Sequence, residues 1–350
     1  MSSFVSDALD EIRRKVQATD ADLREARDRR DAVLEVANTS EGVLRTFASG
    51  SIAHRTALAP ANDADCGLVL DRRACPELGP DGDGVGSADV VESTRTHLRD
   101  GLKEAYPSAT YRVTKRAIYV SFGDDGPTVD LVVALNRKDA PGLWIPHTEG
   151  DDWDASDPEK HTELCDTASA AVSGSTFRRA IRLAKAWNNQ FTTKLCSFNL
   201  EALALASIVG KTGVEGALID LLKYAEVDLK DRLTPDPAGV SDPIKMPTGL
   251  TREQASERLG RARKHLEAAR DADDDQTAAD EMKKVFDDYA TEIDKVRLDR
   301  QLNGTAKFKK APVYAAPILA TKQPRSWGDD PGRRYLPSPL PSQPRPPHST

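Results

Sequence analysis

Two aspartates separated by one residue, Asp63 and Asp65, are the part of the sequence that points most directly to chemistry. The residues around them alternate as in a β-strand, with Ala64 and Cys66 at apolar positions, so both carboxylates project from one face. Like charges this close repel each other unless a cation lies between them, and Mg²⁺ binds a few carboxylate oxygens together with substrate phosphates. The pair therefore predicts a magnesium site for phosphate chemistry.

A glycine–serine step precedes this strand. Gly50 and Ser51 predict a tight turn that opens a short helix, whose free N–H groups and positive dipole end would face a phosphate. Ser51 could bond a β- or γ-phosphate oxygen through its hydroxyl and backbone N–H, or act as an ordinary helix cap with the same geometry. His54 and Arg55 follow in this helix, where a surface position fits at least as well as phosphate contact.

These residues resemble the signature of the polymerase-β-type nucleotidyltransferase superfamily, in which a Gly-Ser turn is followed about a dozen residues later by Asp-x-Asp. The family keeps its third metal carboxylate at the start of a later strand. Strands are predicted at about 110–114, 117–122 and 128–135, and Asp130 is a lone acidic residue at the start of the last one. The resemblance implies that the sheet brings Asp130 beside Asp63 and Asp65.

Three carboxylates suit two divalent ions about 4 Å apart, which activate the attacking oxygen and stabilise the departing one in nucleotidyl transfer. We expect Asp63 and Asp65 to bridge both ions. Asp130 is expected to hold the ion nearest the sugar hydroxyl and to help remove its proton. The predicted cofactor is therefore a pair of Mg²⁺ ions, which Mn²⁺ could replace.

Later segments, at 153–161, 177–188 and 194–201, are similar to bacterial cyclic-oligonucleotide synthases of the CD-NTase family. Those enzymes belong to CBASS anti-phage systems and are relatives of oligoadenylate synthases and cyclic GMP-AMP synthase. The resemblance implies that Lys185 and Ser197 hold the triphosphate and nucleotide from a helical lobe, and that Phe198 stacks on a base. Phe198 is equally consistent with a core position.

Helical spacing puts Arg178, Arg182 and Lys185 at i, i+4 and i+7, one positive stripe that could also be solvated or paired with acids. His161 is more consistent with a packing or helix-surface residue than with a ligand.

The resemblance implies an α+β fold with two lobes, in which a small mixed β-sheet with flanking helices is followed by a C-terminal helical lobe. The expected domains are a catalytic lobe with N-terminal scaffold helices at 1–150, a helical oligoadenylate-synthase-like lobe at 151–320 and a Pro-rich disordered tail at 321–350. Two helices are predicted within 4–37, the second capped by Thr19 and Asp22. Further helices are predicted at about 87–106, 157–171, 175–191, 197–209, 213–226, 251–271 and 276–301.

Composition bounds the possible classes. The 350 residues are 39% hydrophobic and 30% charged, which is typical of a soluble globular protein, and no apolar run reaches the ~20 residues of a membrane span. Without a signal-peptide pattern, we expect a cytoplasmic protein. The four cysteines have no metal-site spacing and are interpreted as reduced core thiols. The aspartates at 151–154 and 271–275 are expected to solvate a loop and a helix end.

The net charge of −7 argues against a broad nucleic-acid-coating surface but not against nucleotides. No zinc-binding insertion is visible, so zinc-dependent DNA sensing is not expected. A regulatory protein partner remains open, and the Pro341–Pro344 PxxP pattern is one place where it could dock.

We predict an Mg²⁺-dependent nucleotidyltransferase that condenses NTPs, ATP among them, into a cyclic di- or trinucleotide second messenger for anti-phage defence. One alternative is a template-independent transferase acting on RNA ends or on a protein. Another, from a different class, is a catalytically inactive nucleotide-binding or scaffold protein. The three aspartates weigh against inactivity, because an inactive relative is free to lose them.

Overall fold

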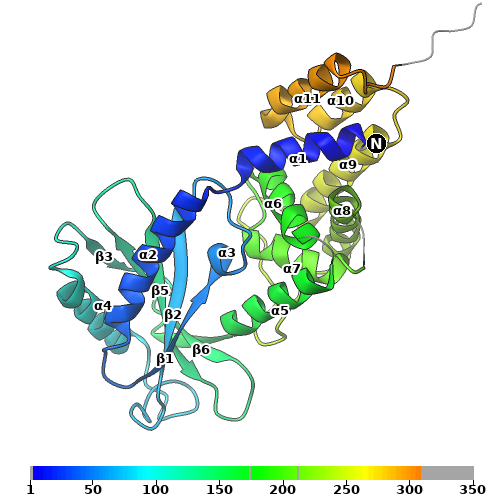
Figure 1. The fold of residues 1–350 in the computed structure, drawn as a ribbon. Coiled ribbons are helices and arrows are strands. Elements are labelled where there is room, and N and C mark those ends of the chain that lie inside the picture. Colours follow the sequence, from blue (N-terminus) through cyan, green and yellow to red (C-terminus); the bar gives the residue numbers. More distant parts are fainter. Residues whose placement is uncertain (1–2, 173–174, 211–212, 309–350) are drawn as a thin grey trace, which may run out of the picture. The chain divides into compact units, whose positions relative to one another are not determined.

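The structure, a computed structural model, describes residues 3–172, 175–210 and 213–308 (Figure 1). All of these residues fall within one compact unit, Met1–Lys309. The predicted tail at 321–350 and its Pro341–Pro344 pattern lie outside the described residues. The strands are β1 (Val43–Ser49), β2 (Asp63–Leu70), β3 (Thr110–Val113), β4 (Ile118–Ser121), β5 (Thr128–Asn136), β6 (Leu143–His147) and β7 (Asp152–Ser156). The helices are α1 (Phe4–Val16), α2 (Asp20–Ala37), α3 (Gly50–Ala53), α4 (Ala88–Leu102), α5 (Pro158–Ala171), α6 (Thr176–Asn189), α7 (Ser197–Ser207), α8 (Val214–Asp231), α9 (Arg252–Arg270), α10 (Asp275–Lys283) and α11 (Ala290–Leu302), with a 3₁₀ turn η2 (Asp287–Tyr289).

The two N-terminal helices pack against different halves of the compact unit. The predicted cap between them is confirmed, because Thr19 and Asp22 form a reciprocal capping box at the start of α2. The buried face of α1, which includes Leu9 and Ile12, lies in the same core as the helices α6 to α11. The buried face of α2, which includes Val33, packs instead with one face of the sheet and with α4 (Figure 1).

The sheet is mixed, as predicted. Its main path runs β1-β2-β5-β4-β3, and β6 pairs with β5 and β7. Strands β2 and β5 are parallel neighbours, whereas β1–β2, β4–β5 and β3–β4 are antiparallel. The predicted strands at 110–114, 117–122 and 128–135 correspond to β3, β4 and β5. This order sets the strand of the Asp-x-Asp motif directly beside the strand that carries Asp130.

Three strands, β1, β6 and β7, were not predicted. Residues 151–154 were expected to solvate a loop, but Asp152–Ser156 forms β7 and pairs with β6 in antiparallel register. The reason is Trp153, whose side chain is buried in the sheet core between exposed or half-buried aspartates. A single buried aromatic residue outweighs its charged neighbours, because such a side chain removes a large apolar area from water.

The helices from α5 to α9 follow the predicted ranges, except that α8 continues to Asp231 where the prediction ended near residue 226. One helix was predicted over 276–301, but the chain forms α10, then η2, then α11. Phe286 lies between α10 and η2 with φ −123° and is fully buried in the helical core. The break between the two helices therefore coincides with a buried aromatic residue. No helix among the described residues is both long and apolar enough to cross a bilayer.

Candidate active site

Asp63, Asp65 and Asp130 lie on two adjacent parallel strands. In the register of β2 and β5, Asp65 is paired with Asp130, and Asp63 with Thr128. Ala64 and Cys66 are buried on the opposite face of β2, as the alternation predicted. The tertiary structure therefore gathers the third aspartate beside the first two. Residues paired in register on parallel strands project from the same face of the sheet.

The carboxylates of this acidic set repel one another. Burial, together with the charges of Asp63 and Asp130, raises the pKa of Asp65 from 3.8 to about 6. The pKa of Asp130 is also raised, first by burial and then by Asp63. Asp130 Oδ1 is buried without a hydrogen-bond partner. Such a group is costly to bury, so the set is electrostatically incomplete without a cation.

These observations fit a divalent cation. Carboxylate oxygens are the ligands that Mg²⁺ prefers, and an orphaned carboxylate oxygen is a vacant ligand position. Among the described residues, one group has three possible ligand atoms within 4.8 Å of one another, and it consists of His54, Cys165 and Glu201. The oxygens of the three aspartates do not all lie this close, so the acidic set is more open than an occupied metal centre. Mutual repulsion is a sufficient reason for aspartates to remain apart in the absence of a counter-charge.

The glycine of the Gly-Ser step is required by its surroundings. Gly50 has φ +69°, and a Cβ built there would lie 1.7 Å from Asp65 Oδ2. Any side chain would therefore strain the turn and displace the Asp65 carboxylate. Ser51 follows within α3, and its hydroxyl makes no hydrogen bond to the described part of the chain. The interpretation of Ser51 as a helix cap is wrong, because Ser49 occupies the N-cap position.

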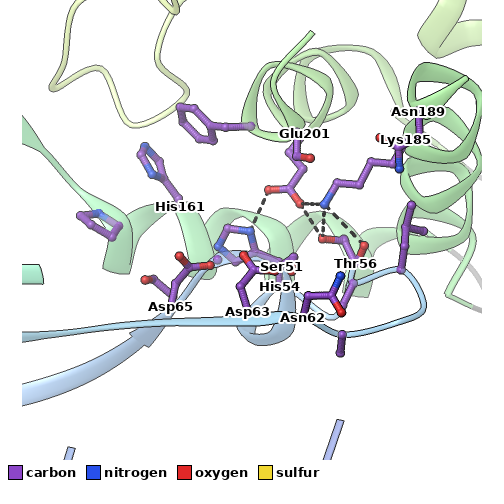
Figure 2. Close-up of a pocket in the computed structure, with 18 of the residues that line it drawn as sticks. Ser51, His54, Thr56, Asn62, Asp63, Asp65, His161, Lys185, Asn189 and Glu201 are labelled. Atoms are coloured by element: carbon purple, nitrogen blue, oxygen red, sulfur yellow. Dashed lines mark hydrogen bonds and ion pairs between the residues drawn. The ribbon is translucent and has the colours of Figure 1, made fainter. Parts of the chain in front are cut away.

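A cavity of about 410 Å³ lies between this turn and the helical half. Gly50, Ser51, Asp63 and Asp65 line one side of it, and residues of α5, α6 and α7 line the other (Figure 2). Asp130 is not among the lining residues. The cavity thus brings the Gly-Ser turn and two of the three aspartates together with Lys185, Ser197 and Phe198, which the sequence placed more than 100 positions later.

Ser197 is exposed at the first position of α7, and its hydroxyl makes no hydrogen bond to the described residues. Phe198 is half-buried, and its ring lies 4.6 Å from that of His161. His161 is buried and its Nε2 lies 2.6 Å from Asp236 Oδ1, so the interpretation of His161 as a packing residue is confirmed. Phe198 therefore presents part of its ring to the cavity with a fixed neighbour behind it.

Lys185 belongs to a buried polar cluster on the helical side of the cavity, and the exposed fraction of its side chain is 5%. Its Nζ donates to Glu201 Oε1 at 2.7 Å, to Thr56 Oγ1 at 2.9 Å and to the Thr56 carbonyl at 3.4 Å. Glu201 Oε2 lies 2.8 Å from His54 Nδ1 (Figure 2). The predicted contact of Lys185 with a triphosphate requires the ammonium to exchange one of these acceptors for a phosphate oxygen.

The Glu201 carboxylate is stabilised in its charged form. Burial opposes ionisation, but the hydrogen bond from His54 and the charge of Lys185 outweigh it and lower the pKa of Glu201 to about 2. His54 is itself buried, so the expectation that it lies on the surface is wrong. It is buried because the helical half covers α3 and supplies Glu201 as its partner.

Two arginines of the α6 stripe reach the same segment. Arg178 Nε donates to the His54 carbonyl at 3.1 Å and also pairs with Asp166. Arg182 donates to the Arg55 carbonyl at 2.6 Å. The stripe is therefore not simply solvated, because each of its three cations contacts a carbonyl in the segment that directly follows α3.

Glu201 was not predicted as a site residue, although the sequence carries a signal for it. It is the single charged residue in the run Leu200–Ala206, and helical geometry puts it one turn after Ser197 on the same side of α7. An acidic residue in an apolar helix implies a buried partner, because an unpaired carboxylate would be costly there. The sequence does not say that this partner is Lys185 or His54.

The cysteines were expected to be buried. Cys66 and Cys165 are, but Cys75 is half-buried and Cys196 is exposed at the start of α7, so the expectation is wrong for those two. All four are free thiols. Cys165 lies near His54 and Glu201, but both Glu201 oxygens are already engaged, and burial raises the pKa of the Cys165 thiol to about 12. In this group the Glu201 oxygens are fully engaged, whereas His54 Nε2 is buried without a hydrogen-bond partner.

Residues 5–168 match the family model of the Second Messenger Oligonucleotide or Dinucleotide Synthetase domain. A curated relative, the CBASS oligonucleotide cyclase CdnC of Escherichia coli (strain KTE188), is 30% identical over 168 residues, which cover 43% of this chain and 51% of the relative. The chain thus matches about half the length of that curated protein.

Solved structures extend the likeness into the helical half. The structure of E. coli MS115-1 CdnC with ATP is 17% identical, with a TM-score of 0.61, and the match covers 82% of this chain and 98% of that one. The Vibrio cholerae DncV cyclic AMP-GMP synthase is 14% identical, with a TM-score of 0.62, over 83% and 97%. At these identities the likeness shows the fold, which is the predicted two-lobed α+β nucleotidyltransferase fold.

Proposed function

We propose that this chain is a nucleotidyltransferase that makes a cyclic di- or trinucleotide from NTPs, and the match of residues 5–168 to the second-messenger synthetase domain model supports the proposal. The observation that carries the proposal is the incomplete acidic set on β2 and β5 beside the Gly-Ser turn. Three uncompensated carboxylates next to an open polar cavity have no structural benefit. They are what a metal-dependent phosphoryl-transfer site needs before its cations bind.

Asp63, Asp65 and Asp130 would hold two Mg²⁺ ions, or Mn²⁺ in their place. When bound, such ions supply charge neutralisation at the α-phosphate and lower the pKa of the attacking hydroxyl. In the proposed reaction this hydroxyl oxygen forms a bond to the α-phosphorus while the bond to pyrophosphate breaks. Asp130 Oδ1, which has no partner and whose carboxyl has a raised pKa, is suited to accept the hydroxyl proton.

The remaining cavity residues would bind and orient the nucleotide. The Ser51 hydroxyl and the backbone at Gly50 would contact the β- or γ-phosphate, since both residues line the cavity and the hydroxyl has no partner among the described residues. Ser197 would contact the nucleotide from the opposite side. The exposed part of the Phe198 ring would stack on a base, with ATP among the substrates.

The decisive experiment is incubation of the purified chain with labelled NTPs and Mg²⁺ or Mn²⁺, followed by phosphatase and mass spectrometry. A phosphatase-resistant cyclic product is expected. The Asp63→Ala/Asp65→Ala variant should abolish it while keeping the wild-type circular dichroism spectrum. The matched control removes two exposed loop aspartates, Asp125→Ala/Asp139→Ala, and should leave product formation unchanged.

Label transferred to RNA ends or to a protein would replace the proposal with the alternative transferase. Absence of any product with both metals would support an inactive nucleotide-binding protein. Persistent product in the Asp63→Ala/Asp65→Ala variant would refute the metal assignment.

The biological role proposed for the product is that of a second messenger in CBASS-type anti-phage defence, within the cytoplasm and under control of a regulatory protein. The support is the match of residues 5–168 to a second-messenger synthetase domain model, together with the 30% identity over 168 residues to a CBASS oligonucleotide cyclase. Phage challenge of cells that express the chain with its neighbouring genes tests this. Protection is expected with the wild type and not with Asp63→Ala/Asp65→Ala.

A further inference from the structure

We propose that Arg112, on β3, binds the 5′-triphosphate of the nucleotide whose hydroxyl attacks, and that Tyr119, on β4, holds the guanidinium of Arg112 in place. The inference rests on the proposed function and deepens it, because it assigns residues to the second of the two nucleotides that the reaction joins. It is carried by the register of the sheet and by the surroundings of the Arg112 side chain.

The sheet aligns these two residues with the acidic set. Asp65 is paired with Asp130 across β2 and β5. Asp130 is paired with Tyr119 on β4, which is paired in turn with Arg112 on the edge strand β3. Because residues opposite each other on neighbouring strands project from the same face, the four side chains form one row across the sheet. Two strand spacings separate Arg112 from Asp130, which is about 10 Å between their Cα atoms.

The two faces of β4 and β3 differ in burial. Ile118 and Val120 on β4 are fully buried in the core that the sheet shares with α2 and α4. Tyr119, between them in sequence, projects from the other face and is only half-buried, and Arg112 beside it is exposed. This end of the row is therefore accessible to a ligand that also contacts the acidic set.

Arg112 carries a charge without a partner in the described part of the chain. Its guanidinium carbon lies 4.9 Å from the centroid of the Tyr119 ring, and among the described residues it has neither a hydrogen-bond acceptor nor a carboxylate partner. A guanidinium presents five N–H donors in a planar fork that suits phosphate oxygens. Stacking on a tyrosine ring orients this fork and uses none of the donors. All five are thus available to an anion.

The charge of Arg112 already acts on the acidic set. Burial and then the charge of Asp63 raise the pKa of Asp130, whereas the charge of Arg112 opposes this shift. The guanidinium therefore lies close enough to Asp130 for their charges to interact. A cation at this place favours the approach of a polyanion, which the aspartates alone would repel.

The proposed reaction needs a cation to one side of Asp130. The attacking hydroxyl is expected at Asp130, and the α-phosphate of the other nucleotide beside the metal ions. The sugar separates the attacking hydroxyl from its own 5′-phosphates, so those phosphates must lie away from Asp130. The cavity toward the helical half is proposed to hold the other nucleotide, which leaves the side of β4 and β3 for these phosphates. Arg112 supplies the positive charge there.

The test gives each substrate a single role and uses the full chain. 2′,3′-Dideoxy-ATP can only donate its nucleotidyl group, because it has no sugar hydroxyl for attack. α,β-Methylene-ATP can only accept, because its bridging carbon blocks the release of pyrophosphate. Arg112→Gln should lower kcat/KM for α,β-methylene-ATP about 10- to 100-fold, chiefly through KM, as expected when a hydrogen bond to a charged group is lost.

Adenosine as the acceptor gives a readout that a merely structural role of Arg112 would not produce. Adenosine has the attacking hydroxyls but no phosphate, so the wild type and Arg112→Gln should use it equally within about twofold. Arg112→Lys keeps the charge without the fork and should recover at least about threefold of the loss with α,β-methylene-ATP. Equal losses with both acceptors, or no loss with either, in variants folded by circular dichroism would overturn the proposal.

Tyr119 is tested by its ring. Tyr119→Leu removes the ring beside the guanidinium and should lower kcat/KM for α,β-methylene-ATP about two- to fivefold, the size of an exposed cation–π contact. Tyr119→Phe keeps the ring and should match the wild type, so an equal loss in both variants would contradict the stacking role. Should Arg112→Gln fail to fold, Arg112→Lys and Tyr119→Leu decide by the same comparison of the two acceptors.

The matched control is Arg137, whose guanidinium carbon lies 4.8 Å from the centroid of the Trp144 ring. It follows the last residue of β5, whereas Asp130 lies near the start of that strand. Arg137→Gln should leave kcat/KM unchanged for both acceptors. A loss with α,β-methylene-ATP equal to that of Arg112→Gln would overturn the assignment.

Binding separates this inference from the proposed function. Titration calorimetry with α,β-methylene-ATP and Mg²⁺ should detect two sites on the wild type, one of which is about tenfold weaker in Arg112→Gln. If the wild type shows this difference but forms no product, the proposed function fails and the assignment of Arg112 stands. If product forms and Arg112→Gln matches the wild type in binding and rate, only the assignment fails. A single site on the wild type would also overturn it.

Discussion

Asp65 and Glu201 line the same cavity, and both are carboxylates removed from most solvent, yet their acidities move in opposite directions. The pKa of Asp65 is raised to about 6, by burial and by the neighbouring Asp63 and Asp130. For Glu201 burial acts in the same direction, but His54 and Lys185 overcome it and the pKa falls to about 2. The two sides of the cavity therefore differ in whether the protein itself supplies the counter-charge.

This difference separates two uses of buried charge. In the cluster around Glu201 the Lys185 ammonium and both carboxylate oxygens are paired, and the atom without a partner is His54 Nε2, so the paired charges hold parts of the chain together. The acidic set on β2 and β5 is incomplete, and Asp130 Oδ1 lacks any partner. A protein retains such a group only where something else completes it or where its strain is part of the mechanism. We therefore expect a cation at the acidic set on β2 and β5, whereas the cluster around Glu201 has a structural role.

The largest expected effect is on the incomplete side. Asp130→Asn keeps the shape of the side chain but removes one charge of the set, and it should reduce the rate of product formation about 1,000-fold, the order seen when one member of a catalytic set is lost. The rate is measured with labelled NTPs under saturating Mg²⁺. Asp125→Asn, in the exposed turn before β5, is the control and should retain the wild-type rate.

A wild-type rate for Asp130→Asn would show that the third carboxylate is not needed for the reaction. It would contradict the interpretation of the acidic set as the catalytic side of the cavity.

On the complete side the expected effect is on stability. Glu201→Leu leaves the ammonium of Lys185 buried without a counter-charge and should lower the free energy of unfolding by about 3 to 5 kcal/mol, the usual cost of breaking a buried pair. Urea unfolding followed by circular dichroism measures it. Glu163→Leu, which breaks an exposed pair with Lys160 on α5, should cost less than about 1 kcal/mol.

Similar costs for the two leucine variants would mean that the Glu201 cluster is not structural.

The same comparison predicts a stabilising change. Asp65→Asn removes a charge that the fold disfavours, and it should raise the free energy of unfolding of the metal-free protein at pH 7 by about 2 to 3 kcal/mol. The folded pKa of about 6 exceeds the ordinary value of 3.8, so the folded state binds the proton more tightly. Wild-type stability in chelator should therefore fall as the pH rises from about 4 to about 6.

Thermal unfolding in EDTA across this pH range measures the effect, and Asp65→Asn should show a flatter profile there. Added Mg²⁺ should stabilise the wild type more than the variant. A variant less stable than the wild type in EDTA would contradict the view that this side is incomplete.

The smallest expected effect concerns Arg178, which contacts the backbone of His54 next to the Glu201 cluster. Arg178→Gln removes the bond to the His54 carbonyl and the half-exposed pair with Asp166, and it should cost about 1 kcal/mol of stability, the net value of a typical hydrogen bond. The midpoint of urea unfolding measures this. Arg179→Gln on the same helix turn is the control. An equal change in both variants would indicate a general effect of charge on α6.

Much of this molecule could be predicted from local pattern. The alternation around Asp63 and Asp65, the capping box of Thr19 and Asp22, and the glycine at position 50 are fixed by nearest neighbours in sequence, and all three have the predicted form. The predictions were wrong where contacts with distant parts of the chain determined the local structure. The charged stretch around the buried Trp153 forms β7. The helix predicted over 276–301 is interrupted at the buried Phe286, although its periodicity predicted a continuous helix.

The sequence by itself determined the strand carrying the two aspartates, the turn before it and the order of helices after it, because these depend on residues within a few positions of each other. Only the tertiary structure decided that Asp130 faces Asp65, through strand register, and that Glu201 takes up Lys185 and His54. His54 and Glu201 are 147 positions apart, and no local periodicity specifies which partner a buried charge will meet. The partner of a buried charge is determined by tertiary packing, since the two residues meet only when the two halves pack around α3.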